Sequence, residues 1–472
     1  MVQHSRIAVF DPPRAPVRES TGRIALRALI VLVFIAAFAH SALYNLAGPV
    51  GALATGALLL LALVATGITA LIRTGPRAFR WRRLPWTALA LTALGLISLL
   101  WSAWPEATLL TWPVQAAMAA SGIIIAALVS WEEIIRAMAT ALTIILIASL
   151  GLELWVAAVV RHPVLPFFSD FPDGPIDPHW YWVRGNLLHG GRIQGVVGNS
   201  NLLAMLCLIA LIVFALLFVR HARMRTPVGA GIVLAGFLFV RSGSATAWVC
   251  LVAVVVTAAA VVFLRTAADA TARWRRGLVV ACSALLGVIA ATLAFSPLAA
   301  LLGRDDSLTG RSAIWNAVAE RAVERPFFGH GFSSPWVPWD PGFDGWITDH
   351  GITVIHAHSI WLDTRLQLGA LGVILLGITL VALTWRSWFF ATDRPRWDLH
   401  AQRAYSPLAL APILIVVALL VQGLTESGPA MLWGWQLVVL LSFKLKSVPL
   451  MSPDFGEAAA LPVHGRVTIR MP

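Results

Sequence analysis

Long apolar runs separated by short polar segments dominate the pattern of this chain. Residues 251–264 and 408–423, for example, contain no charged side chain. A window of about 20 residues, the length of helix that crosses a lipid bilayer, finds about twelve such runs. They are centred near residues 36, 61, 94, 118, 146, 209, 234, 254, 289, 377, 414 and 437. The pattern predicts an all-α polytopic membrane protein with about twelve transmembrane helices.

The composition favours a membrane protein over a soluble one. Apolar residues make up 58% of the 472 residues and charged residues only 12%, whereas soluble proteins carry about 25% charged residues. The mean hydropathy is +0.80. The net charge of +12 does not indicate nucleic-acid binding, because the basic residues are scattered through short loops. The three cysteines lie in apolar runs, so neither a disulfide framework nor a cysteine-based metal site is expected.

The distribution of basic residues predicts the orientation of the chain in the membrane. With the N-terminus inside, the cytoplasmic segments contain 26 of the 35 Lys and Arg residues but only 9 of the 23 Asp and Glu residues. Because cytoplasmic loops carry such an excess of basic residues, both termini are expected on the cytoplasmic side of the inner membrane. The chain then divides into a cytoplasmic segment 1–27, a transmembrane domain 28–447 and a flexible cytoplasmic tail 448–472.

Two of the predicted outer loops are long, at 161–197 and 303–360. Loops longer than about 15 residues are usually functional or disordered. These two are rich in Trp, His, Arg and Pro, so we expect them to be ordered and to place an active site on the extracytoplasmic face. Their Trp residues are typical of membrane-interface belts, although indole rings also stack on sugars.

Several arginines lie in or beside these loops, against the orientation bias. Arg192 lies in the first loop, Arg311 in the second, and Arg365 opens the span that follows. The planar guanidinium grips carboxylates or phosphates through two hydrogen bonds, so these residues are candidate anion ligands. Alternatively, they extend to the membrane interface or pair with Asp and Glu of the same loops.

The second loop is predicted to contain a short amphipathic helix over 312–325. Arg311 would then stand at the helix N-terminus, where backbone N–H groups favour an anion. A capped surface helix without a ligand is the alternative. Apolar residues recur there at helical spacing: Ile314, Ala317, Val318 and Ala322.

The end of the second loop brings a candidate base close to the next span. If that helix begins near His356, then His358, Trp361 and Arg365 share one face. A metal site of His356 and His358 with Asp349 or Asp363 is an alternative. Because a two-residue spacing on a helix separates the ligands, we expect no metal there.

A glycine-rich stretch from Gly190 to Asn201 ends the first loop. Its backbone, together with Arg192, Asn199 and Asn201, can hold an anion or a sugar hydroxyl. Gly and Asn are also common in turns and helix caps, so the stretch alone is a weak signal.

Four stretches between about residues 190 and 430 resemble the O-antigen ligase and Wzy-type polymerase superfamily, which includes exopolysaccharide polymerases. Residues 192–201 are similar to the family's Arg-Gly…Gly-Asn-x-Asn before a span. Residues 309–331 are similar to its Thr-Gly-Arg-x-x-x-Trp stretch, which closes on Pro and Gly-x-Gly. The family's His-Asn pair, followed by Leu and Gly-x-x-Gly, is similar to residues 358–372. Residues 424–427 resemble an exopolysaccharide-type Leu-Thr-Glu-Ser. The residues that carry these similarities are Arg192, Asn199, Asn201, Thr309, Gly310, Arg311, Trp315, Pro326, Gly329, Gly331, His358, Leu362, Gly369, Gly372, Leu424, Thr425, Glu426 and Ser427.

The chain departs from the family pattern at two places. Ser359 stands where the family has the Asn after its His, which puts any role of that amide in doubt. The family often has Ser-Arg in the eighth span, whereas this chain has Ser244-Ala245, with Arg241 three residues before them. The combination separates ligase from polymerase poorly, although the Leu-Thr-Glu-Ser stretch favours a polymerase.

The resemblance implies a membrane glycosyltransferase of the GT-C type. Such an enzyme, surrounded by membrane lipids, would move a glycan from an undecaprenyl-diphosphate carrier to a hydroxyl of a glycan or lipid acceptor on the outer side. The reaction would need neither a cofactor nor a metal. Arg192 and Arg311, with Arg241 or Arg365, would neutralise the departing diphosphate. His358 would accept the proton of the attacking hydroxyl, since imidazole titrates near neutral pH. The expected supporting or sugar-binding residues are Asn199, Asn201, Trp315, Trp361 and Asp363.

We expect the enzyme to polymerise a surface polysaccharide or exopolysaccharide, together with other polysaccharide-assembly proteins, and two alternatives stay open. In the first, it would ligate the glycan to a separate lipid or protein. A multispanning transporter or flippase is the alternative of a different class. Such proteins carry charged residues at mid-membrane, where this chain has little more than Glu153.

Overall fold

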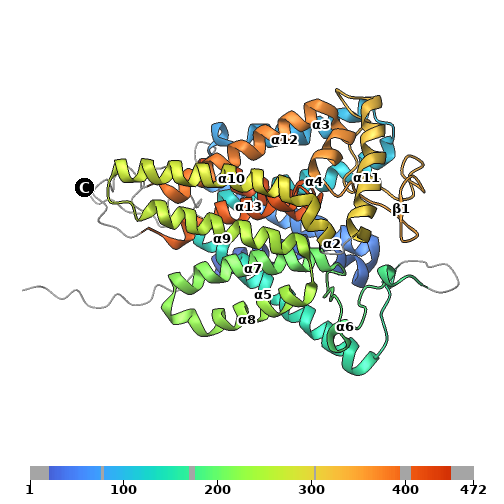
Figure 1. The fold of residues 1–472 in the computed structure, drawn as a ribbon, viewed down its shortest axis with the longest axis horizontal. Coiled ribbons are helices and arrows are strands. Elements are labelled where there is room, and N and C mark those ends of the chain that lie inside the picture. The colour runs from blue at the N-terminus through green and yellow to red at the C-terminus, as the bar shows by residue number, and fades with distance from the viewer. Residues whose placement is uncertain (1–20, 76–78, 169–175, 302–304, 394–404, 448–472) are drawn as a thin grey trace, which may run out of the picture.

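The computed structural model describes residues 21–75, 79–168, 176–301, 305–393 and 405–447, and only the backbone of 288, 290–301 and 305–310. The described chain is mostly helical, with one two-stranded hairpin (Figure 1). Its α-helices are α1 (Thr21–Phe38), α2 (His40–Thr74), α3 (Trp86–Ile97), α4 (Pro105–Leu128), α5 (Trp131–Trp155), α6 (Asn186–His189), α7 (Ser200–Arg220), α8 (Arg225–Ser242), α9 (Ala245–Arg265), α10 (Ala270–Leu301), α11 (Asp305–Glu324), α12 (Ile360–Thr392), α13 (Ala411–Gln422) and α14 (Leu432–Ser447). The shorter elements are η2 (Trp81–Arg83), η3 (Ser98–Leu100), η4 (Val156–Val160), η5 (Pro178–Trp180), η6 (Ala222–Met224), η8 (Pro407–Leu410), η9 (Gly428–Ala430), β1 (Thr348–Asp349) and β2 (Ile352–Thr353).

Each of the twelve predicted span centres falls inside a helix of this structure. Within the described residues, eight helices are long and apolar enough to cross a membrane by length and composition: α1, α2, α4, α5, α7, α8, α9 and α12. Helices α3 and α13 belong to shorter apolar segments, and α14 has 16 residues. These apolar helices fit a multi-pass membrane protein. By the length and composition of the described helices, there are thus fewer candidate spans than the twelve predicted from the sequence.

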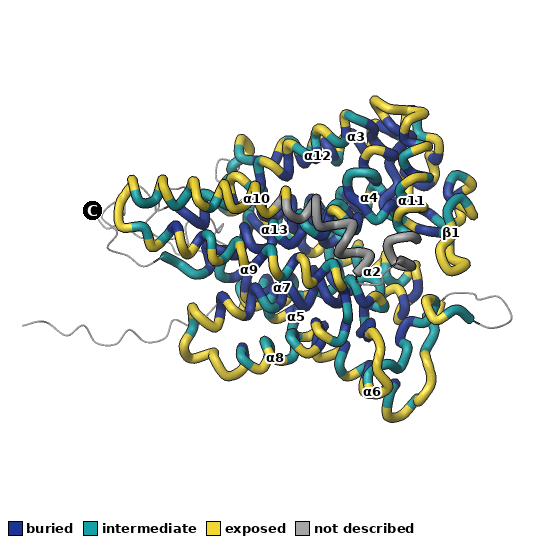
Figure 2. The backbone as a smooth tube through the Cα atoms, in the orientation of Figure 1, coloured by how far each residue is buried: buried dark blue, intermediate teal, exposed yellow. Residues whose placement is uncertain are grey.

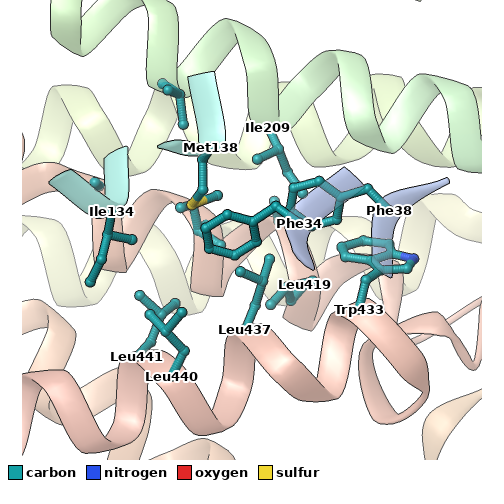
Figure 3. Packing of buried hydrophobic residues seen from close by; sticks show 14 of the residues in the cluster. Phe34, Phe38, Ile134, Met138, Ile209, Leu419, Trp433, Leu437, Leu440 and Leu441 are labelled. Carbon is teal, nitrogen blue, oxygen red and sulfur yellow. The ribbon is translucent and has the colours of Figure 1, made fainter. Parts of the chain in front are cut away.

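Two helices, α7 and α14, form the centre of the bundle. Most residues of both are buried, and Figure 2 shows this core as dark blue inside a rim of exposed helices. The buried side chains come from segments far apart in the sequence. Figure 3 shows Phe34 and Phe38 of α1 beside Met138 of α5, Ile209 of α7 and Leu437 of α14. A helix that is hydrophobic on all sides is typical of such a central position.

The outer helices expose apolar rather than polar side chains. Leu58 and Leu61 of α2 are 68% and 64% exposed, and Val252 and Val256 of α9 are both 61% exposed. Contiguous apolar surface of this kind is unfavourable in water and favourable against lipid acyl chains. The surface therefore agrees with the hydropathy of the sequence.

The two long predicted loops lie at the same end of the bundle. In Figure 1, α6 of the first loop and α11 and β1 of the second are all on the right, whereas the α7–α8 and α9–α10 connections are on the left. The described parts of both loops have local order. Val164 and Val183 form an isolated antiparallel bridge in the first loop, and β1 pairs with β2 in the second. The bundle thus presents both loops together. The predicted tail 448–472 and most of the segment 1–27 lie outside the described residues.

Gly122 sets the close approach of α4 to α14. A Cβ atom at this position would lie 2.7 Å from the backbone oxygen of Gln436, whereas a Cβ at Gly151 of α5 would meet no atom of the described residues within 4 Å. We therefore expect Gly122→Ala to lower the free energy of unfolding by about 1–3 kcal/mol through overpacking. Gly151→Ala is the matched control and should be neutral or stabilising by up to about 1 kcal/mol. Thermal unfolding of the purified variants in detergent checks this, and equal effects at both positions would contradict it.

Candidate active site

The carboxylate of Glu426 is the meeting point of the polar residues at the loop end of the bundle. Glu426 lies in the turn between α13 and η9 and is only 8% exposed. Arg311 of α11 donates to Oε1 at 2.7 Å, and the amide of Asn201 in α7 donates to the same oxygen at 3.1 Å. Nδ1 of His358 lies 3.2 Å from Oε2. One carboxylate therefore joins four segments that are far apart in the sequence.

Arg192 extends this network by one residue. Its NH2 group donates to the side-chain oxygen of Asn201 at 2.6 Å, and its Nε donates to the backbone oxygen of Ser242 at 2.9 Å. Asn199 caps the N-terminus of α7, because its side-chain oxygen accepts from the backbone N–H groups of Asn201 and Leu202. The glycine-rich stretch thus serves both as a helix cap and as the carrier of Arg192.

The surroundings of Glu426 keep its carboxylate ionised. Burial alone raises the pKa of Glu426, but the hydrogen bond to His358 and the charges of His358 and Arg311 outweigh burial and lower the pKa to about 2. An ionised carboxylate only accepts hydrogen bonds, so Nδ1 of His358 carries the proton of that contact. When this ring is neutral, Nε2 is therefore the nitrogen that can accept a proton.

His358 does not belong to the helix that follows it, which corrects the sequence-based expectation. Helix α12 begins at Ile360 with Ser359 as its N-cap, and His358 has a φ of 50°. This left-handed backbone turns His358 away from the face that Trp361 and Arg365 share. The side chain reaches Glu426 instead.

His356 lies beside His358 rather than pointing elsewhere. The backbone N–H of His358 donates to Nδ1 of His356 at 3.2 Å, and the two rings are 4.1 Å apart between centroids. Burial, reinforced by the charge of His358, lowers the pKa of His356 to about 3. His356, His358 and Glu426 offer ligand atoms within 4.8 Å of one another. The separation argued from helical spacing was therefore wrong, and the third potential ligand is Glu426 rather than Asp349 or Asp363.

Helix α11 begins earlier than expected, at Asp305 instead of Ser312. Arg311 consequently lies in the second turn of the helix and not at its N-terminus, so the N-terminal N–H groups cannot assist it as predicted. Trp315 follows one turn later on the same helical face. Its indole nitrogen is buried and has no hydrogen-bond partner among the described residues. A buried indole N–H of this kind is a donor available to a polar ligand.

The remaining candidate residues lie outside the Glu426 network. Arg241 of α8 donates to the backbone oxygens of Asn186 and Leu187 at 2.8 and 3.0 Å, and so fastens the first loop to the bundle. In α12, Arg365 is exposed and Trp361 packs against the apolar core. Asp363, also in α12, is buried and accepts from the indole of Trp336 and the amide of Gln367, both at 2.9 Å.

Sequence reasoning missed two carboxylates that organise the site. Glu426 was noted only as part of the Leu-Thr-Glu-Ser stretch, and no role was predicted for it. Glu153 of α5 accepts from the backbone N–H groups of Gln194 and Gly195, both at 2.9 Å, and so holds the stretch that carries Arg192. One sequence signal could have identified both residues, because each is an isolated carboxylate in an apolar stretch. Such a carboxylate needs hydrogen-bond donors when it is buried, and positions of this kind are often functional.

Comparisons with known proteins show which family this chain resembles. Residues 230–377 match the family model described as O-antigen ligase. The exopolysaccharide production protein ExoQ of Rhizobium meliloti (strain 1021) is 25% identical over 312 residues, which cover 62% of this chain and 62% of that protein. The two matches confirm the resemblance to the O-antigen ligase and Wzy-type polymerase family. The chain thus aligns with less than two thirds of the length of this relative.

The family match covers only part of the Glu426 network. Arg311 and His358 lie within residues 230–377, whereas Arg192, Asn201 and Glu426 lie outside it. The structure brings the matched and unmatched parts together through direct hydrogen bonds. The network is therefore a property of the folded chain and not of the matched segment alone.

The pair of Arg311 and Glu426 should be strongly coupled in stability. In a cycle of Arg311→Gln, Glu426→Gln and the double variant, we expect a coupling of about 1–3 kcal/mol at neutral pH. Because the pKa of Glu426 is lowered from 4.5 to about 2, the coupling is present above pH 4.5 and is lost as the pH falls toward 2. Unfolding in detergent at several pH values measures it. Additive effects of the two substitutions at neutral pH would contradict the ion pair.

Proposed function

We propose that this protein is a membrane glycosyltransferase that transfers a glycan from an undecaprenyl-diphosphate carrier to a sugar hydroxyl on the extracytoplasmic face, and that it polymerises a surface polysaccharide or exopolysaccharide. The observation that carries the proposal is the contact of the buried carboxylate of Glu426 with Arg311 and His358, and its connection to Arg192 through Asn201. The match to the O-antigen ligase family and the name of the relative ExoQ support it.

The arginines supply what a diphosphate leaving group requires. When the bond between the anomeric carbon and the diphosphate oxygen breaks, negative charge develops on undecaprenyl diphosphate, and nearby guanidinium groups stabilise it. Arg311 has five N–H donors, so its contact with Glu426 leaves it capacity for a phosphate. Arg192 lies on the other side of Asn201 and would grip the same group. Arg241 would not contact the diphosphate itself. It would hold the first loop, which carries Arg192, against the bundle.

His358 is the proposed base. The acceptor hydroxyl attacks the anomeric carbon opposite the diphosphate, which inverts the configuration, and its proton passes to Nε2 of His358. Glu426 holds the Nδ1–H tautomer and stabilises the imidazolium that forms. The adjacent His356, Trp315 and Asp363 are proposed to shape the sugar site. Because arginine supplies the positive charge, the mechanism needs neither a metal nor another cofactor.

The proposed orientation follows from the charge distribution of the sequence and the common location of the two long loops. With both termini in the cytoplasm, the loop end of the bundle faces the outer side of the cytoplasmic membrane. The carrier lipid would reach the site from the surrounding bilayer, and the glycan acceptor from the extracytoplasmic space. Other polysaccharide-assembly proteins remain proposed partners.

Ligation is a second candidate function, because the matched family model bears the description O-antigen ligase. In that case the same residues would transfer the glycan to a separate lipid or protein acceptor. The stretch Leu424 to Ser427 favours the polymerase, since it resembles an exopolysaccharide-type motif and supplies Glu426 to the site.

The decisive experiment uses purified protein and an undecaprenyl-diphosphate oligosaccharide without any other acceptor. We expect a ladder of lengthening chains on a gel and its loss in His358→Ala, which should still bind the donor. His189→Ala changes an exposed histidine of the first loop and is the matched control with a normal ladder. A normal transfer rate in His358→Ala would overturn the assignment of the base.

The same assay separates the alternatives. Transfer that occurs only after a separate lipid or protein acceptor is added would identify a ligase. The absence of transfer under both conditions, with the lipid-linked sugar instead moved across a vesicle membrane, would identify a transporter or flippase.

Arg311→Lys tests the planar grip on the diphosphate. Lysine keeps the charge but lacks the fork that binds two oxygens at once, so we expect at least a tenfold loss of transfer, or about 1.4 kcal/mol. Arg161→Lys, which changes an exposed arginine at the end of η4, should retain the rate. Initial rates at saturating and limiting donor concentration separate loss of binding from loss of turnover, and an unchanged rate at both concentrations would remove Arg311 from the site.

A further inference from the structure

A second cluster of metal-ligating side chains joins the two long loops away from Glu426. Asp177 and His179 belong to the first loop, and His350 belongs to the second. Nδ1 of His179 lies 2.7 Å from Oδ1 of Asp177, and Nδ1 of His350 lies 3.5 Å from Oδ2 of the same carboxylate. The two imidazole rings are stacked, with 3.7 Å between their centroids. Two histidines from different loops thus direct the same ring nitrogen toward one carboxylate.

The spacing of these atoms fits one transition-metal ion. Zinc binds histidine nitrogen and carboxylate oxygen at about 2.0–2.2 Å in a tetrahedron, which places neighbouring ligand atoms about 3.3 Å apart. The two measured separations, 2.7 and 3.5 Å, lie on either side of that value. The ligand atoms of all three residues lie within 4.8 Å of one another. Small rotations of the side chains would bring all three onto one ion.

The backbone of His350 gives an independent reason to assign it a function. His350 and Gly351 form the two-residue turn between β1 and β2, and their φ values are 50° and 73°. Two-residue hairpin turns with both φ values positive favour Asn-Gly, Asp-Gly or Gly-Gly. A non-glycine residue with a positive φ is uncommon, although His is one of the residue types enriched there. The imidazole of His350 thus stands in a turn that usually contains Asn, Asp or Gly.

Residues next to His350 orient its imidazole ring so that Nδ1 can bind a metal. Oδ1 of Asp349 lies 3.8 Å from Nε2 of His350, on the ring nitrogen that does not face Asp177. A carboxylate beside the second nitrogen of a ligating histidine orients the ring and holds the proton on that nitrogen. The indole of Trp180 donates to the backbone oxygen of His350 at 3.1 Å, so the two loops already touch. The site is therefore built before any ion arrives.

We propose that Asp177, His179 and His350 form a zinc-class metal site that ties the first long loop to the second, with water as the fourth ligand. The positive charge of the ion would offset the negative charge of Asp177. The ion would not bind to any residue of the Glu426 network. Its role is to fix the loop that carries Arg192 relative to the loop that carries His358. This proposal does not depend on the chemistry proposed for His358, because binding of the ion is measured without any glycan.

The test is zinc binding by the purified full-length protein, stripped with EDTA and titrated with Zn²⁺. We expect one ion per chain by elemental analysis and a rise in Tm with zinc. His350→Asn removes the imidazole but retains a residue that accepts the turn, and it should weaken binding about 10–100-fold or more. His179→Gln should have the same effect, and His189→Ala, in the same loop, should have none.

Two results would overturn the site. Zinc bound normally by both His350→Asn and His179→Gln but lost in His358→Ala would place the ion at His356, His358 and Glu426 instead. A wild-type protein that shows neither a stoichiometric ion nor a shift in Tm would exclude the site directly. Unchanged zinc-free Tm values of the two variants confirm that the fold is intact, so that a loss of binding reflects lost ligands.

Discussion

The buried carboxylate of Glu426 is the constraint on which the loop end of this molecule depends. A charge that is only 8% exposed is tolerated when hydrogen bonds and opposite charges surround it, and here each partner comes from a different segment. Arg311 comes from α11, Asn201 from α7 and His358 from the segment that leads into α12. Satisfying one carboxylate therefore fixes the relative positions of three segments that hydrophobic packing alone would leave less well defined.

A second carboxylate, that of Glu153, also fixes the position of a segment near the site. Glu153 receives two backbone N–H groups of the stretch before α7, and Arg241 binds two backbone oxygens of the same loop. The side chains of Glu153 and Arg241 both form hydrogen bonds with backbone atoms. They therefore fix the path of the loop and not the position of a particular side chain. Arg192 gains its position as a result, because it lies between the segment held by Glu153 and the end of α8. The apolar bundle thus supports the site through a few polar contacts at its end.

Hydropathy predicted the helices well because burial in a bilayer leaves a signal in every window of the sequence, and each predicted centre falls within a helix. The polar site was harder to predict. Arg311, His358 and Arg192 were each recognisable, but Arg311 and His358 meet at Glu426 in the turn after α13, and Arg192 reaches it only through Asn201. No local pattern relates that turn to them. The starts of α11 and α12 were misplaced for a similar reason. The positive φ of His358 is stabilised by its contact with Glu426, a tertiary interaction that helical spacing does not contain.

The proposed diphosphate site contains a carboxylate, and the charges of the Glu426 network account for this. Arg192 and Arg311 contribute two positive charges and Glu426 one negative charge, so the proposed site would retain a net attraction for a diphosphate while its arginines are held in place. Without Glu426, two guanidinium groups and a protonated histidine would repel one another, and His358 would lose the acceptor that stabilises its charged form. In the proposed mechanism, His358 would accept a proton while the arginines stabilise the leaving diphosphate. Glu426 would then link the proposed base to the proposed leaving-group site, so that acid–base chemistry and phosphate binding share one connected set of hydrogen bonds.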